Sequence, residues 1–72
     1  MKLWEYDGKH VKITTVDNEI FRGKACDFTP AQDNVPEISS ICIGNIEFYE
    51  NEIANIEEIW PYNIQPKQGE KL

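Results

Sequence analysis

Two adjacent strand patterns within residues 10–28 constrain the fold of this chain more than any other segment. Apolar or β-branched residues alternate with polar ones over residues 11–15, which predicts a half-buried β-strand over residues 10–16. Asp17-Asn18 follows, and both residue types tolerate the positive φ of a two-residue hairpin turn. Residues 19–28 predict the second strand. The segment therefore predicts a β-hairpin.

The second strand of this hairpin carries small residues in its middle. Phe21, Gly23 and Ala25 fall on one face, which we expect to point to the core, and the intervening side chains fall on the other. A glycine inside a strand allows a sharp bend or a close approach by another part of the chain. A hairpin with such a kink predicts a short sheet that curls into a small barrel.

Further elements follow the hairpin. Residues 29–37 contain two prolines and predict a long loop, which is the best candidate for a binding loop. A phase change at Gly44-Asn45 predicts a tight turn. We expect the remaining strands over residues 38–43, 46–49 and 54–59, with a short turn or 3₁₀ turn at 50–52.

Residues 53–59 are ambiguous between strand and helix. Ile53, Ile56 and Ile59 recur at a spacing of three, which also fits a helical stripe. The short, isoleucine-rich window favours a strand, because four strands would leave a small barrel open. Residues 1–9 predict one short turn of helix or an extended lead-in, in which Leu3, Trp4 and Tyr6 are expected to cover one end of the core.

The length of 72 residues predicts one domain, which we assign to residues 1–65, with a flexible, extended C-terminal tail over 66–72. So small a core usually needs further stabilisation, and self-association is the expected source. The N-terminus carries no signal-peptide pattern, and no apolar run approaches the roughly 20 residues that cross a bilayer. We expect a cytoplasmic protein without a membrane partner.

Charge and side-chain chemistry narrow the function classes. Thirteen acidic and seven basic residues give a net charge of −6, which argues against DNA or any broad binding to nucleic acid. The single His10 lacks the partner that orients a catalytic base, so no catalytic residue is assigned. Cys26 and Cys42 either bridge neighbouring strands or, as we favour, stay reduced. No metal and no cofactor are expected.

The hairpin resembles the first conserved segment of the Sm-like (LSM) family, of bacterial type. The matching features are a Gly8-Lys9 lead, the strand at residues 11–13, the Asp17-Asn18 turn, the aromatic Phe21, and Gly23 two residues on. The resemblance covers the first half of the chain closely and the second half only by layout. It implies a strongly bent, five-stranded antiparallel barrel of the Src-homology type.

The resemblance also implies partners. Family members form rings by pairing the fourth strand of one subunit with the fifth strand of the next. Many bind RNA through two loops at the pore. Edge pairing of this kind covers exposed strand edges and adds buried area, so a homo-oligomer formed through edge strands is expected.

The family's RNA-contacting residues are only partly present. Thr29 stands where the family has an aspartate, and Asp33-Asn34 comes later in the loop. The second motif, residues 49–53, contains no arginine to stack on a base. We therefore expect a non-catalytic Sm-like barrel that acts as a self-assembling protein-interaction module. The alternative is single-stranded RNA binding through the 29–37 loop and the turn between strands four and five, by Asp33, Asn34, Tyr49, Lys9, Lys12, Arg22 and Lys24.

Overall fold

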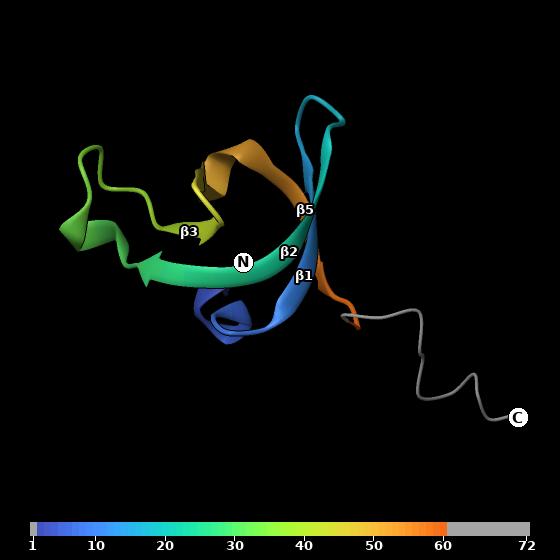
Figure 1. The fold of residues 1–72 in the computed structure, drawn as a ribbon. Coiled ribbons are helices and arrows are strands. Elements are labelled where there is room, and N and C mark those ends of the chain that lie inside the picture. Colours follow the sequence, from blue (N-terminus) through green and yellow to red (C-terminus); the bar gives the residue numbers. More distant parts are fainter. Residues whose placement is uncertain (1, 61–72) are drawn as a thin grey trace, which may run out of the picture.

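Five antiparallel strands and three short 3₁₀ helices make up residues 2–60, the part of the computed structural model that is described (Figure 1). In chain order the elements are η1 (Leu3–Tyr6), β1 (His10–Thr15), β2 (Ile20–Thr29), η2 (Ala31–Asp33), β3 (Ser40–Ile43), β4 (Ile46–Tyr49), η3 (Glu50–Glu52) and β5 (Ile53–Glu58). The expected all-β class and the strand interpretation of residues 53–59 are confirmed. The tail assigned to 66–72 lies outside the described residues.

The β1–β2 hairpin forms as expected, with Ile13 directly opposite Phe21. Its connection is longer than the two-residue turn that we predicted. The Thr15 N–H donates to the Glu19 carbonyl at 2.9 Å, and within this connection Asn18 has a positive φ, of 68°. Three-residue hairpin loops commonly end in one left-handed residue, the position that Asn18 occupies here. The Thr15 hydroxyl accepts further hydrogen bonds from the N–H groups of the turn.

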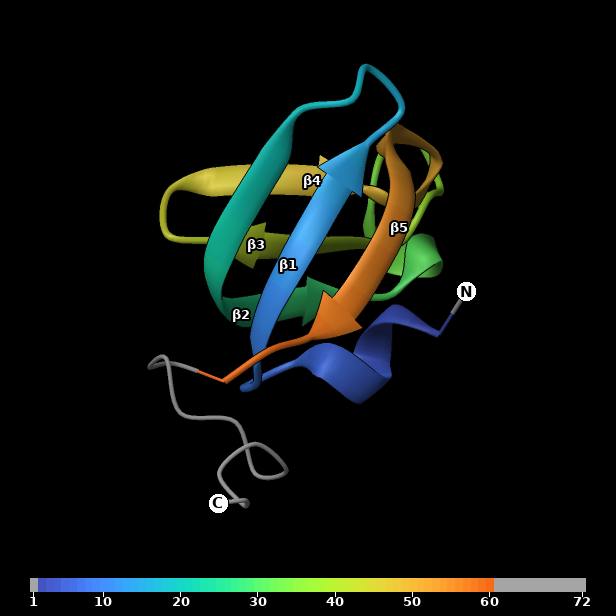
Figure 2. The same cartoon turned by 90° about the vertical axis from the view of Figure 1, so that its right-hand side faces the viewer.

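Strand β2 bends between two layers. Its first half pairs with β1 and its second half pairs with β3. In Figure 2 the strands β1 and β5 form a layer with the start of β2, while β3 and β4 cross behind them. A Cβ atom added at Gly23 would lie 2.5 Å from the Ile43 Cγ2 atom, so the absent side chain permits the close packing at this bend.

The sheet is open, which corrects the expected closed barrel. The strand order is β4-β3-β2-β1-β5, and within residues 2–60 no pairing joins β4 to β5. After β4, the three residues of η3 turn the chain toward β1. Strand β5 therefore pairs with β1 and not with β4. Both β4 and β5 are therefore edge strands.

Strand β5 accommodates the isoleucine spacing of three by a bulge. Ile56 lies opposite Ile13 and Ile53 lies opposite Thr15, so β5 has one residue more than β1 between these two pairs. A bulge adds one residue to one strand, so Ile53 and Ile56 both face the core although three positions separate them. The helical alternative for this segment is wrong.

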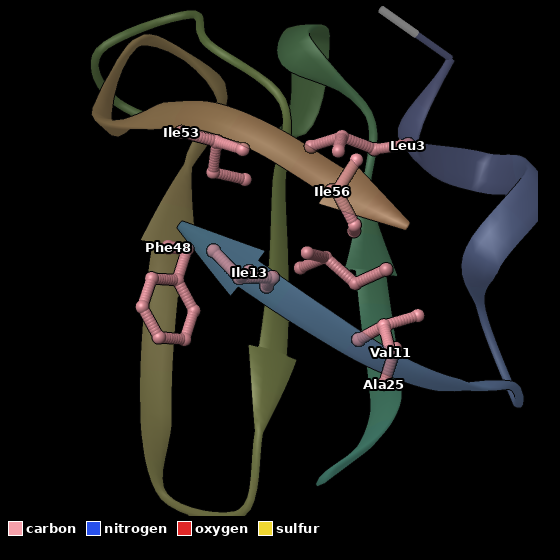
Figure 3. Packing of buried hydrophobic residues seen from close by; sticks show 8 residues of the cluster. Leu3, Val11, Ile13, Ala25, Phe48, Ile53 and Ile56 are labelled. Carbon is pink, nitrogen blue, oxygen red and sulfur yellow. The ribbon is translucent and has the colours of Figure 1, made fainter. Parts of the chain in front are cut away.

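The core lies between the two layers and is closed at one end by η1 (Figure 3). Its buried side chains are Leu3, Val11, Ile13, Ala25, Ile41, Phe48, Ile53 and Ile56. Phe21 packs beside it, edge-on to Phe48 with ring centroids 5.0 Å apart. Tyr6 packs against the core as expected, whereas Trp4 is largely exposed. Leu3 and Tyr6 thus cover this end of the core as expected, and Trp4 lies mostly outside it.

Several strand ends differ from the prediction by one or two residues, and the largest differences flank the long loop. Thr29 belongs to β2, so the long connection runs over residues 30–39 instead of 29–37. Strand β3 begins at Ser40, two residues later than expected, because Ile38 hydrogen-bonds back to Pro36 within the loop. The loop itself contains the single turn η2.

Candidate interaction site at the sheet edges

A pocket of about 210 Å³ lies between the tip of the β1–β2 hairpin, strand β4 and η3. Its apolar lining comes from Val16, Phe21, Ile46 and Phe48, and its polar lining from Thr15, Asp17, Glu19 and Glu52. Val16 is 60% exposed and Ile46 is 46% exposed, so apolar surface remains in contact with water at the mouth. An apolar floor with an acidic rim suits a partner that presents an apolar side chain beside a basic one.

The edge strand β4 runs along this pocket. The Glu50 N–H donates to the Ser39 carbonyl at 2.8 Å, so the backbone groups of Glu50 point to β3. Because the direction of the backbone groups alternates along a strand, those of Tyr49 and Glu47 point away from the sheet. An edge strand with such outward groups can pair with another chain.

One outward group of β4 has an internal partner. The Tyr49 N–H donates to the Glu52 Oε1 atom at 3.0 Å. A carboxylate that accepts this hydrogen bond partly blunts the edge, which is how native sheets limit unwanted pairing. The backbone around Glu47 is left as the accessible part of the β4 edge.

The second edge is β5. The Ile59 N–H donates to the His10 carbonyl at 2.8 Å, so the backbone groups of Ile59 point to β1. By the same alternation the backbone groups of Glu58 and Ile56 point outward. Beside this edge, the Lys9 Nζ atom lies 3.8 Å from Glu58 Oε1.

The loop candidates for RNA contact lie near one another. The Asn34 side-chain amide donates to the Ile38 carbonyl at 2.7 Å and to the Ser40 hydroxyl at 3.1 Å. Tyr49 lies opposite Ser40 in the sheet. The amide of Asn34 thus holds the 30–39 loop against the start of β3, and Asp33 lies one residue away, in η2.

The cationic candidates lie on the β1–β2 hairpin instead. Lys12 and Arg22 are directly opposite each other, and Lys24 is opposite His10, so these side chains share the outer face. The Lys12 Nζ atom lies 3.4 Å from Glu57 Oε2. Within residues 2–60, Arg22 and Lys24 form no ion pair. Asp33, Asn34 and Tyr49 therefore belong to one group and the outer-face cations to another.

The two cysteines are direct neighbours across β2 and β3. Cys26 lies opposite Cys42, and both are free thiols. Burial raises the pKa of the Cys42 thiol, and the nearby Cys26, Glu47 and Asp27 raise that pKa further. No cluster of three or more metal-binding side chains occurs within residues 2–60.

Sequence reasoning missed the pocket and the role of Glu52 in capping β4. The exposed apolar residues Val16 and Ile46, each next to a turn, were the available signal. They are 30 positions apart in the chain, so only the fold brings them to one pocket.

Comparisons with known proteins leave the family open. The chain matches no protein-family model, no curated protein and no solved structure. Over the described residues, no helix is both long enough and apolar enough to cross a membrane.

Proposed function

We propose that this chain is a non-catalytic, Sm-like interaction module that self-associates through its β4 and β5 edges. The observation that carries the proposal is the pair of edge strands at opposite ends of one open sheet. The fourth and fifth strands are also the ones through which the resemblance implies ring formation. Pairing β4 of one copy with β5 of the next repeats head to tail, and such a contact gives a closed ring where the rotation closes.

The physical gain from this assembly is twofold. It pairs the outward backbone groups at Glu47 and Glu58, and it removes exposed apolar surface beside the β4 edge. For a core of eight buried side chains, burial at an interface is a substantial addition.

The acidic-rimmed pocket extends the proposal to protein partners. A segment that pairs with the β4 edge would place an alternate side chain over Ile46 and Phe48. Lys or Arg in that segment would meet Asp17, Glu19 or Glu52 at the rim. We therefore expect a basic, apolar segment to compete with β5 of the next copy, which ends in Glu57-Glu58, for this edge.

The decisive experiment is the solution mass, measured by light scattering on a sizing column at two protein concentrations. We expect a discrete oligomer. Glu58→Pro removes an outward N–H and should yield monomers, because proline is tolerated at a strand edge but cannot donate. Glu58→Ala is the matched control, since it also removes the carboxylate near Lys9 but keeps the N–H.

Two results would contradict the proposal. A wild-type monomer at high micromolar concentration would remove self-association altogether. An oligomer that persists in a folded Glu58→Pro variant would remove the β5 edge as the interface. Circular dichroism of both variants shows whether the fold is retained.

Single-stranded RNA binding is the second candidate. It is favoured by the cations Lys12, Arg22 and Lys24 on one outer face. Short U-rich or A-rich RNA should then bind at low salt, and Arg22→Glu with Lys24→Glu should abolish binding. No binding by the wild-type protein at low salt would rule this candidate out.

A further inference from the structure

The opposed cysteines of β2 and β3 offer chemistry that the interaction function does not use. Cys26 and Cys42 are cross-strand partners, so their side chains project from the same side of the sheet. Their neighbours Ala25 and Ile41 face the core, which puts both thiols on the opposite face, where each is half-buried. The pair is therefore within reach of small solutes.

The Cα separation that is typical of this kind of pair lies within the range that a disulfide spans. The Ala25 N–H donates to the Lys9 carbonyl, and the Ala25 carbonyl accepts from the Gly8 N–H, each at 2.8 Å. The backbone groups of Cys26 therefore point the other way, to β3, and the pair is of the hydrogen-bonded kind. Such partners have Cα atoms about 5.5 Å apart. Disulfides span Cα separations of about 4.4–6.8 Å.

A β-bulge lies directly beside the pair. The β2–β3 register shifts between Cys26 and Thr29, and Asp27 there has a φ of 53°. Bulges interrupt the regular ladder and re-aim side chains. The sheet next to Cys26 is thus less constrained than a regular ladder, which favours the small adjustment that bond formation needs.

We propose that Cys26 and Cys42 form a redox-responsive modification site that closes to a cross-strand disulfide on exposure to a hydroperoxide. This inference is independent of the proposed self-association. The bond would link β2 to β3 covalently and would close a ring of chain that contains the 30–39 loop.

The reaction balances with hydrogen peroxide as the oxidant. One cysteine, as the thiolate, attacks a peroxide oxygen, the O–O bond breaks, and hydroxide leaves, which gives a sulfenic acid. The second thiol attacks the sulfenic sulfur, the S–O bond breaks, and the hydroxyl leaves as water with the thiol proton. Two thiols and one peroxide thus yield one disulfide and two waters, and the two sulfurs together lose two electrons. A small thiol reverses the bond by exchange.

The acidic surroundings influence the pH at which the thiols become reactive. Glu47 lies opposite Cys42 on β4, and Asp27 follows Cys26. Burial of Cys42 raises its pKa, and the charges on these neighbours add to the rise, so this thiol stays protonated near neutral pH. Because the thiolate is the reactive form, oxidation should speed up as pH rises. Glu47→Gln should speed it at fixed pH.

The test uses the full chain, fully reduced and then treated with hydrogen peroxide at low protein concentration. Intact mass spectrometry should show a monomer lighter by two hydrogen atoms, and alkylation after unfolding should find no free thiol. Fifteen residues lie between the two cysteines. A bridge over about that length should raise Tm on the order of 10 °C. Dithiothreitol should restore both the mass and the original Tm.

Cys26→Ser and Cys42→Ser are the matched controls, and neither should gain Tm on oxidation. Addition of oxygen atoms to the wild-type protein without loss of hydrogen would overturn the proposal. So would a disulfide that forms only between copies, or one that forms equally fast in guanidinium, where the fold no longer brings the thiols together. None of these measurements depends on the oligomeric state of the protein. A negative result would therefore not contradict the proposed self-association.

Discussion

Gly23 links the hairpin to the second layer of the molecule. It lies in the bend of β2 opposite Val11, and the Ile43 side chain of β3 occupies the space where a Cβ atom would be. Ile43 is β-branched and stiff at χ1, so it cannot swing away freely. One missing side chain therefore permits the close packing of β3 on β2.

We predict that Gly23→Ala lowers the free energy of unfolding by about 1–3 kcal/mol, the usual cost of overpacking. Urea titration followed by circular dichroism measures the change. Ile43→Ala provides the control background, because it removes the Cγ2 atom that the new methyl group would meet. The penalty of Gly23→Ala should shrink in that background. If Gly23→Ala lowers the free energy of unfolding equally in both backgrounds, the destabilisation does not come from contact with Ile43.

Cys42 gives a prediction on pH dependence. Its pKa is raised in the folded protein, above all by burial. Below about pH 8.5, the ordinary pKa of a thiol, it is protonated in both states and adds no pH dependence. Above that pH the unfolded chain releases its proton first, so stability falls until the folded thiol also ionises. Under reducing conditions, wild-type stability should fall more steeply above about pH 8.5 than that of Cys42→Ser, and parallel slopes would refute the assignment.

Among the secondary-structure elements, β5 shows how a strand can bury residues at a spacing that suits a helix. A spacing of three between isoleucines suits a helix, yet the bulge in β5 lets a strand place Ile53 and Ile56 on one face. Ile59 follows β5 on the face opposite to Ile56 and is only half-buried. In a strand Ile56 is therefore buried more deeply than Ile59, whereas a helical stripe would bury both side chains alike.

We predict that Ile56→Ala costs about 2–5 kcal/mol, as for other buried isoleucines. Ile59→Ala removes the same atoms from a half-buried position and should cost about 1 kcal/mol or less. Thermal or urea unfolding of the two variants makes the comparison. Equal losses would favour the helical stripe, in which both residues face the core.

Local pattern predicted the strands well and their connections less well. All five strands were expected within one or two residues at their ends, and the order of the faces in β2 was expected correctly. The β1–β2 turn was predicted one residue short, because Val16 has the β-branched side chain of a strand residue while its backbone already belongs to the loop. Bulges in β2 and β5 leave no clear mark in the sequence, since they depend on the partner strand.

For the whole molecule, the net charge of −6 opposes the meeting of two copies. Salt screens this repulsion, so self-association through β4 and β5 should strengthen from about 0.05 to 0.5 M salt. Light scattering over that range measures the effect. RNA binding has the opposite dependence, because phosphate contacts weaken as salt rises. An oligomer that dissociates with rising salt would contradict a dominant role for apolar and backbone contacts.

Local sequence pattern was enough to predict the all-β class, the hairpin, and the face of β2 that points inward. These properties follow from alternation with a period of two and from turn residues, which act over a few neighbouring positions. The acidic balance and the single histidine were equally plain from composition.

Three features became evident only from the three-dimensional fold: the sheet stays open, β4 and β5 are its edges, and Glu52 caps one edge amide. The fold alone set Cys26 opposite Cys42 and assembled the pocket from the hairpin tip, β4 and η3. The physical reason is that each feature joins segments far apart in the chain. Their meeting depends on the bend of β2, the two bulges and the direction of η3, which together fix the register and relative placement of the strands.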